Sequence, residues 1–133
     1  MSRKLTDLHP EMQGLATKFL AACRSEGIDL LVTCTLRSNA EQADLYALGR
    51  TKPGKVVTNA KPGQSMHNFG LALDVVPLRA GKPVWGATGE DGKLWKRIGE
   101  IGEAVGLEWA GRWTKMREFP HFQHPQASAL RKR

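Results

Sequence analysis

The sequence has no long apolar segment. No stretch of about 18 consecutive apolar residues occurs, which argues against a helix that spans a membrane. The N-terminal segment MSRKLTDLHPEMQG also lacks the apolar stretch and the small-residue cleavage site of a secretory signal. We therefore expect a protein that is cytoplasmic when synthesised and does not insert stably into membranes.

Cysteine is scarce, with two residues in the chain. Cys23 and Cys34 lie among apolar neighbours, in segments whose patterns are typical of a helix and a strand. In a chain without an export signal we expect two buried free thiols rather than a disulfide. Neither cysteine has the spacing of a metal site, so any metal ligands come from other residue types.

Acidic residues are also in the minority, and the formal net charge is +7. Such a surface attracts polyanions, and both nucleic acid and anionic polymers of the cell envelope satisfy that attraction. The length of 133 residues suits one domain, since domains of roughly 100 to 150 residues are the commonest. We therefore expect a single domain over residues 1–133, with a basic tail over about 125–133.

Hydrophobic periodicity predicts three helices and several strands. The helices are expected over 10–26, from the Ser38 capping box to Gly49, and from Lys93 to Gly106. Strands are expected over 28–35, 71–76, 107–110 and 121–123, loops over 51–65 and 77–91, and a frayed end over 130–133. Because helices and strands do not alternate regularly, the predicted class is α+β: a small domain with a mainly antiparallel sheet flanked by about three helices.

Four histidines make the search for a metal site short. Asp74 lies seven positions after His67, which on a helix would place them about 10 Å apart, too far for one ion. A turn must therefore bring them together, and Gly70 permits one. A catalytic zinc ion typically has three protein ligands and one position open to water, and either His121 or His124 could be the third ligand.

Glu118 lies three residues before His121. Pro120 opposes a helix here, so the segment is not the helical HExxH motif. A carboxylate beside zinc-bound water can still accept the proton of that water and pass it to a leaving amine. Glu118 is therefore a candidate general base in a hydrolase.

The pattern S-x-H-x-x-G-x-A-x-D over residues 65–74, followed by E-x-x-H over 118–121, resembles a zinc peptidase family. This family, peptidase family M15, includes bacterial D,D-carboxypeptidases, D-alanyl-D-alanine dipeptidases and phage L-alanyl-D-glutamate endopeptidases. Further segments resemble its phage and prophage endolysin branch: Arg37, Gln42 with Leu45-Tyr46, Gly49-Arg50-Thr51, Val57-Thr58-Asn59-Ala60, and Trp109 to Trp113. The resemblance covers about residues 8–122 and implies a hedgehog/D,D-peptidase-like fold.

The resemblance also implies a set of site residues. It places one zinc ion on His67, Asp74 and His121, with Glu118 acting as base and then as acid. It assigns Arg37 to the oxyanion of the tetrahedral intermediate, a role that suits a guanidinium because it stays charged at any working pH.

Other residues are expected near the site with less defined roles. Ser65 and Gln42 match family positions that orient ligands or substrate. Trp109 and Trp113 are expected to line the cleft. His124 is expected to be solvated, because the spacing from Glu118 selects His121 as the ligand.

The function implied by the resemblance is that of an endolysin, a monomer that hydrolyses a stem-peptide bond of bacterial peptidoglycan, first of all L-alanyl-D-glutamate. It would act on the cell wall after release through a separate holin. Glu118 departs from the Asp common in that branch and matches the D,D-cleaving members, so a D,D-carboxypeptidase or dipeptidase acting on precursors is an alternative. A catalytically inactive zinc-stabilised wall-binding module is another. A nucleic-acid binder fits the charge but not the motif spacing.

Overall fold

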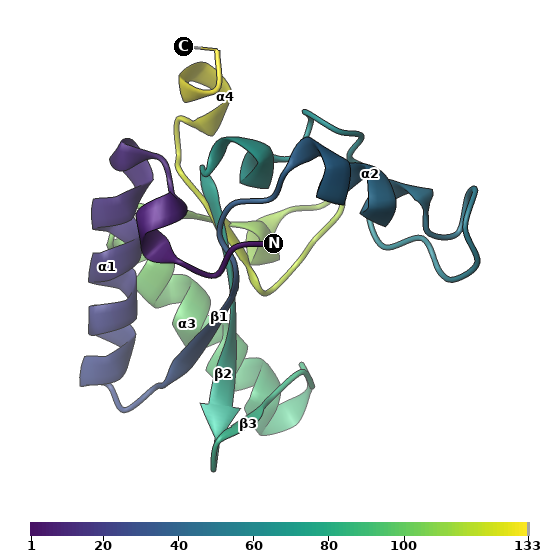
Figure 1. Ribbon diagram of the computed structural model, residues 1–133. Coiled ribbons are helices and arrows are strands. Elements are labelled where there is room, and N and C mark those ends of the chain that lie inside the picture. Colours follow the sequence, from purple (N-terminus) through teal and green to yellow (C-terminus); the bar gives the residue numbers. More distant parts are fainter. Residues whose placement is uncertain (133) are drawn as a thin grey trace.

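An antiparallel sheet forms the centre of the protein (Figure 1). The computed structural model describes residues 1–132. Its strands are ordered β1 (Leu30–Cys34), β2 (Ala72–Arg79), β5 (His121–Gln123) and β4 (Glu108–Trp109), while β3 (Lys82–Pro83) pairs with the end of β2. Neighbouring strands are antiparallel at each pairing. The predicted α+β class with an antiparallel sheet is confirmed.

Two long helices build the core with this sheet. Helix α1 (Pro10–Ser25) begins with proline in its first turn, which suits a position whose N–H needs no partner, and His9 caps it by accepting from the Glu11 N–H. Helix α3 (Gly89–Ala104) packs against α1 and β4. The core that they enclose contains fully buried side chains from α1, α3, β2 and β5, among them Met12, Phe19, Leu73, Val75, Trp95, Ile98 and Phe122.

A third helix lies away from this core. Helix α2 (Asn39–Ala47) begins at the predicted capping box, in which Ser38 and Glu41 bond to each other's backbone N–H. It leads into a loop that extends to one side of the molecule (Figure 1), and residues 53–64 contain neither helix nor strand, as predicted for this stretch. Short 3-10 helices occur at η1 (Leu5–Asp7), η2 (Met66–Phe69) and η3 (Ala110–Arg112).

The segment after Val76 differs from the sequence prediction. A loop was expected over 77–91, yet β2 continues to Arg79 and α3 begins at Gly89. The strand continues through Pro77 because Leu78 donates its N–H to the Asp29 carbonyl and the Pro77 carbonyl accepts from Val84. The helix begins early because Glu90 and Asp91 in its first turn suit the positive end of the helix dipole.

The C-terminal prediction is also partly wrong. Leu130 was expected to be frayed, but it ends helix α4 (Ala127–Leu130) and is buried in a small cluster with Leu71 and Ala127. This apolar contact holds the helix on the domain. Arg133 lies outside the described residues.

The two cysteines are buried and free, as expected, and no helix within residues 1–132 is long and apolar enough to cross a membrane.

Helix α3 approaches the aromatic core unusually closely, at two glycines. A Cβ atom added to Gly99 would lie 2.3 Å from the Trp109 ring, and one added to Gly102 would lie 2.5 Å from the Phe122 ring. Any side chain larger than hydrogen therefore forces a ring or the helix to move.

We expect Gly99→Ala to lower the free energy of unfolding by roughly 1–2 kcal/mol, because the collision with Trp109 outweighs the better helix propensity of alanine. Gly14→Ala is the matched control, since Gly14 is exposed in α1 and has nothing within 4 Å of an added Cβ. It should raise stability by up to about 1 kcal/mol. Urea unfolding measures both, and a Gly99→Ala protein as stable as the wild type would contradict the packing.

Candidate active site

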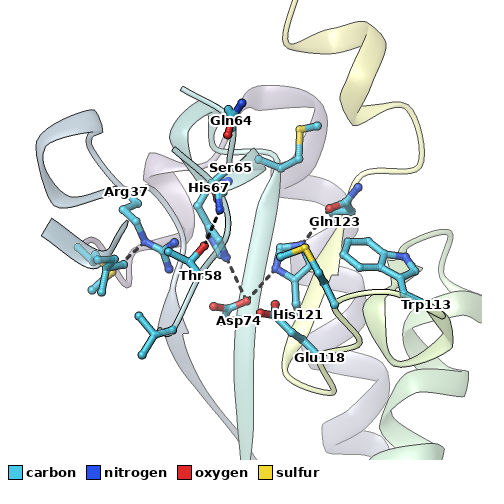
Figure 2. A pocket seen from close by; sticks show the side chains of 16 residues that line it. Arg37, Thr58, Gln64, Ser65, His67, Asp74, Trp113, Glu118, His121 and Gln123 are labelled. Atoms are coloured by element: carbon cyan, nitrogen blue, oxygen red, sulfur yellow. Dashed lines mark hydrogen bonds and ion pairs between the residues drawn. The ribbon is translucent and has the colours of Figure 1, made fainter. Parts of the chain in front are cut away.

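A cleft of about 470 Å³ opens above the ends of β2 and β5. Its lining includes His67, Asp74 and His121 at the base (Figure 2). Arg37 and Thr58 lie on one side of these three residues, and Trp113 and Glu118 lie on the other. The structure thus brings together residues from four distant parts of the chain.

A tight turn presents His67. Ser65 caps the short helix η2 by accepting from the His67 N–H, at 3.2 Å, and the Asn68 side chain bonds back to the Ser65 N–H. Gly70 then reverses the chain with a φ of 69°, and a Cβ there would lie 2.7 Å from the His9 nitrogen. The predicted turn between His67 and Asp74 is therefore present, and glycine is required in it.

Strand pairing brings Asp74 and His121 together. They are directly opposite each other in the β2–β5 register. Asp74 Oδ1 lies 3.2 Å from His121 Nδ1 and 3.0 Å from His67 Nε2. One candidate ligand atom from each of the three residues lies within 4.8 Å of the other two, close enough for a single ion.

The ring nitrogens of both histidines are fixed by outer partners. His67 Nδ1 lies 3.0 Å from the Thr35 carbonyl oxygen, and His121 Nε2 lies 2.9 Å from Gln123 Oε1. Since these partners are acceptors, the outer nitrogens donate, and in a neutral ring the inner nitrogens carry lone pairs.

The two inner lone pairs therefore face the same carboxylate oxygen. His67 Nε2 is buried and has no hydrogen-bonding partner, although Asp74 is near. Two acceptors and a carboxylate converging in one place repel one another unless a cation lies between them. Two imidazoles and one carboxylate are a donor set that suits a catalytic zinc ion, and the residues present therefore fit that metal.

The mutual attraction of these groups shifts their pKa values. Burial lowers the pKa of His67, but the Asp74 carboxylate opposes it and raises that pKa to about 10. Burial raises the pKa of Asp74, and the nearby His67 and His121 outweigh this and hold it well below its usual range. Asp74 is therefore ionised, and its negative charge lies beside both imidazole rings.

Arg37 is held at the cleft by buried neighbours. Its Nη1 donates to Gln42 Oε1 at 2.9 Å, and the fully buried Gln42 donates in turn to the Ala60 carbonyl at 2.8 Å. Its Nη2 lies 3.7 Å from Cys34 Sγ. Gln42 therefore joins the arginine to the loop on its side of the cleft.

The two tryptophans expected at the cleft have different places. Trp113 lines it, with its ring centroid 5.6 Å from that of His121. Trp109 does not: it is 4% exposed, its ring stacks with those of Phe119 and Phe122, and it donates to the Phe119 carbonyl. The prediction for Trp109 was wrong because α3 presents glycine opposite its ring, which opens a place for it in the core.

His124 is the other correction. It was expected to be solvated but is 9% exposed, and its Nδ1 accepts from the Gln126 N–H at 2.9 Å. Sequence reasoning also missed Gln123. Side chains two residues apart on a strand share a face, so the alternation from His121 was a signal that could have identified it.

Comparisons with known proteins agree with this geometry. A family model described as D-alanyl-D-alanine carboxypeptidase matches residues 58–124, about half of the chain. The peptidoglycan L-alanyl-D-glutamate endopeptidase CwlK of Bacillus subtilis is 38% identical over 123 residues, which cover 89% of this chain and 74% of that protein. The L-alanyl-D-glutamate peptidase of Listeria phage A118 is 30% identical over 108 residues, and the aligned part is 81% of this chain but 34% of the phage protein.

Solved structures show the same fold. The Serratia marcescens L-Ala D-Glu endopeptidase ChiX has a TM-score of 0.68 and 24% identity, over 94% of this chain and 86% of that one. A variant of the vancomycin-resistance D,D-pentapeptidase VanY, in complex with Zn(II), has a TM-score of 0.65 and 17% identity, over 95% and 79% of the two chains. With the family model spanning half of the chain and the Bacillus relative aligning with most of it, this protein belongs to the D-alanyl-D-alanine carboxypeptidase family, peptidase family M15.

Proposed function

We propose that this protein is a zinc-dependent peptidoglycan peptidase that hydrolyses the L-alanyl-D-glutamate bond of the stem peptide. The observation that carries the proposal is the convergence of two imidazole lone pairs and one carboxylate at the base of a cleft. The choice of bond is supported by the names of the Bacillus and Listeria phage relatives.

We assign zinc binding to His67 Nε2, the Asp74 carboxylate and His121 Nδ1. Zinc held by three such ligands supplies Lewis acidity, which lowers the pKa of water and polarises a carbonyl. Gln123 and the Thr35 carbonyl keep the outer ring nitrogens protonated and so direct the inner ones at the ion.

Glu118 is the proposed general base. Its carboxylate is exposed in the wall of the cleft, on the same side of the ligands as Trp113 (Figure 2). From there it can accept a proton from the attacking water and donate it to the leaving amine, which must gain a proton to depart. Its backbone N–H bonds to the Ala110 carbonyl, which ties this segment to η3.

Arg37 is the proposed stabiliser of the carbonyl oxygen as that oxygen gains negative charge. The guanidinium needs no proton transfer to remain positive, and its bond to Gln42 holds it in place before substrate binds. Ser65 positions His67 through the η2 cap, and Trp113 offers an aromatic surface beside the ligands. A net charge of +7 suits an anionic cell wall.

A D,D-carboxypeptidase is the second candidate. It is favoured by one residue, Glu118, which replaces the aspartate common in the endolysin branch, and by the description of the matching family model. As an endolysin, the protein would act as a monomer and would depend on a separate holin to reach the wall.

The bond cleaved should be visible in the products. We expect digestion of purified sacculi to yield two products that mass spectrometry identifies: glycan fragments that keep only the L-alanine of the stem, and released peptides whose new N-terminus is D-glutamate. Release of D-alanine from soluble stem peptides, with intact sacculi left unsolubilised, would identify the D,D-carboxypeptidase instead.

Glu118→Gln should lower the rate of bond cleavage by about 10²–10⁴-fold, because an amide of nearly the same shape cannot take up the proton. Zinc content should be unchanged, since Glu118 is not one of the assigned ligands. Glu90→Gln is the control, because Glu90 is exposed on α3 away from the cleft. Full activity of Glu118→Gln would refute the assigned mechanism.

Gln123→Leu should weaken zinc binding about 10- to 100-fold, because His121 loses the acceptor that fixes its tautomer. Gln123→Glu keeps an acceptor oxygen and should bind zinc about as tightly as the wild type. Competition with a zinc-sensitive dye measures affinity without reference to activity, and Gln126→Leu serves as the exposed control. Equal affinity of all four proteins would show that Gln123 does not direct the ligand.

A further inference from the structure

The wall of the cleft on the side of Arg37 includes a segment without helix or strand. Residues 57–60 belong to the long loop after α2, and Val57, Thr58 and Ala60 line the cleft on the side of Arg37 (Figure 2 labels Thr58). Val57 is 54% exposed, which is unusual for a valine in a small domain. Such a segment keeps a defined position only if side chains from other parts of the protein bond to it, and these bonds are called ties below.

Arg50 supplies most of these ties. Its Nη1 donates to the Tyr46 carbonyl at 2.7 Å and to the Thr58 carbonyl at 3.0 Å, while its Nη2 donates to Asn59 Oδ1 at 3.1 Å. The guanidinium also lies over the Tyr46 ring, 3.9 Å from its centroid. One side chain therefore joins the end of α2 to residues 58 and 59.

The turn beside Arg50 brings the loop after α2 close to the end of that helix. Gly49 has a φ of 76°, and a Cβ there would lie 2.6 Å from the Val56 backbone nitrogen. Its N–H donates to the Lys52 carbonyl, and the N–H groups of Arg50, Thr51 and Lys52 all donate to the Ala47 carbonyl. The chain thus folds back on itself so that the loop after α2 returns beside the helix that carries Arg50's partner Tyr46.

The second tie comes from Gln42, which is buried in α2 and donates to the Ala60 carbonyl as well as accepting from Arg37. Residues 58–60 are therefore fixed to α2 at both ends, by Arg50 and by Gln42. Three sequence patterns that metal binding does not explain meet here: Gln42 with Tyr46, Gly49-Arg50-Thr51, and the Val57–Ala60 segment.

We propose that Arg50 is a positioning residue that fixes residues 57–60 as the substrate-binding wall of the cleft. The wall faces Trp113 across the assigned zinc ligands, so a peptide lying in the cleft contacts it without the reacting bond touching Arg50. The tie acts on substrate binding more than on the chemical step, because the ligands are held separately by η2 and the sheet. This inference rests on the proposed function.

The test compares Arg50→Ala, Arg50→Lys and the control Lys52→Ala. Lys52 belongs to the same loop, but its Nζ pairs with the exposed Asp44 of α2 rather than with residues 57–60. Kinetics on a soluble stem peptide should show kcat/KM of Arg50→Ala lowered on the order of 10- to 100-fold, with the larger change in KM. Zinc affinity should be unchanged, and Lys52→Ala should behave like the wild type.

Arg50→Lys distinguishes the hydrogen bonds that Arg50 makes to residues 58 and 59 from the effect of its positive charge. Lysine keeps the positive charge but lacks the planar fork that reaches several acceptors at once, so it should restore little of the lost binding. Full restoration by lysine would mean that the charge itself acts on substrate, and would overturn the proposal. So would an unchanged KM in Arg50→Ala.

A second measurement does not depend on activity. Lys55 is the trypsin site in this loop that all three variants keep, since proline follows both Lys52 and Lys61. Cleavage after Lys55 should be faster in Arg50→Ala than in the wild type or Lys52→Ala. Faster cleavage with an unaltered KM would show that the segment is tied by Arg50 but does not bind substrate. If the wild type hydrolyses no peptide, the proposed function fails, and equal cleavage rates would still refute the tie.

Discussion

The convergence of His67 and His121 on one oxygen of Asp74 is the interaction on which the rest of the site depends. His67 Nε2 lies 3.0 Å and His121 Nδ1 lies 3.2 Å from this oxygen. A nitrogen lone pair repels a carboxylate oxygen at such a distance, so a proton or a cation must lie between them. The β2–β5 register holds one side, and the η2 turn ending at Gly70 holds the other. Because Thr35 and Gln123 fix the outer nitrogens, the protein prepares the donor set before any ion binds.

Much of this could be predicted from sequence because the signals are local. The Ser38–Glu41 capping box and the left-handed glycine at position 70 each depend on a few adjacent residues, and the structure contains both. Grouping His67, Asp74 and His121 required a family resemblance, since spacing alone allowed either His121 or His124 as the third ligand. The sheet then separates those two: His121 faces the cleft from within β5, while His124 lies beyond the strand and is bonded to the Gln126 backbone.

The remaining differences come from contacts between distant residues. Trp109 enters the core because Gly99 and Gly111 leave space for its ring. The sequence around each glycine does not indicate that a tryptophan ring packs against it. Strand β2 passes through Pro77 because the next residue, Leu78, donates its N–H to the Asp29 carbonyl and the Pro77 carbonyl accepts from the Val84 N–H, contacts that local propensity cannot indicate. In the same way, the ties of Arg50 to residues 58 and 59 exist only once the loop has folded back on α2. The three assigned zinc ligands are thus held by the sheet and by η2, whereas residues 58–60 are held by Arg50 and by Gln42 of α2.

The position of zinc itself tests the account most directly. Crystals grown with zinc, measured with X-rays at the zinc absorption edge, should give one strong anomalous peak at about 2.0–2.2 Å from His67 Nε2, an Asp74 carboxylate oxygen and His121 Nδ1. Rotation of either imidazole should not be needed to reach it. A peak at Cys34 or His124, or ligation through His121 Nε2 with Gln123 displaced, would contradict the central claim that these three residues form a prepared zinc site.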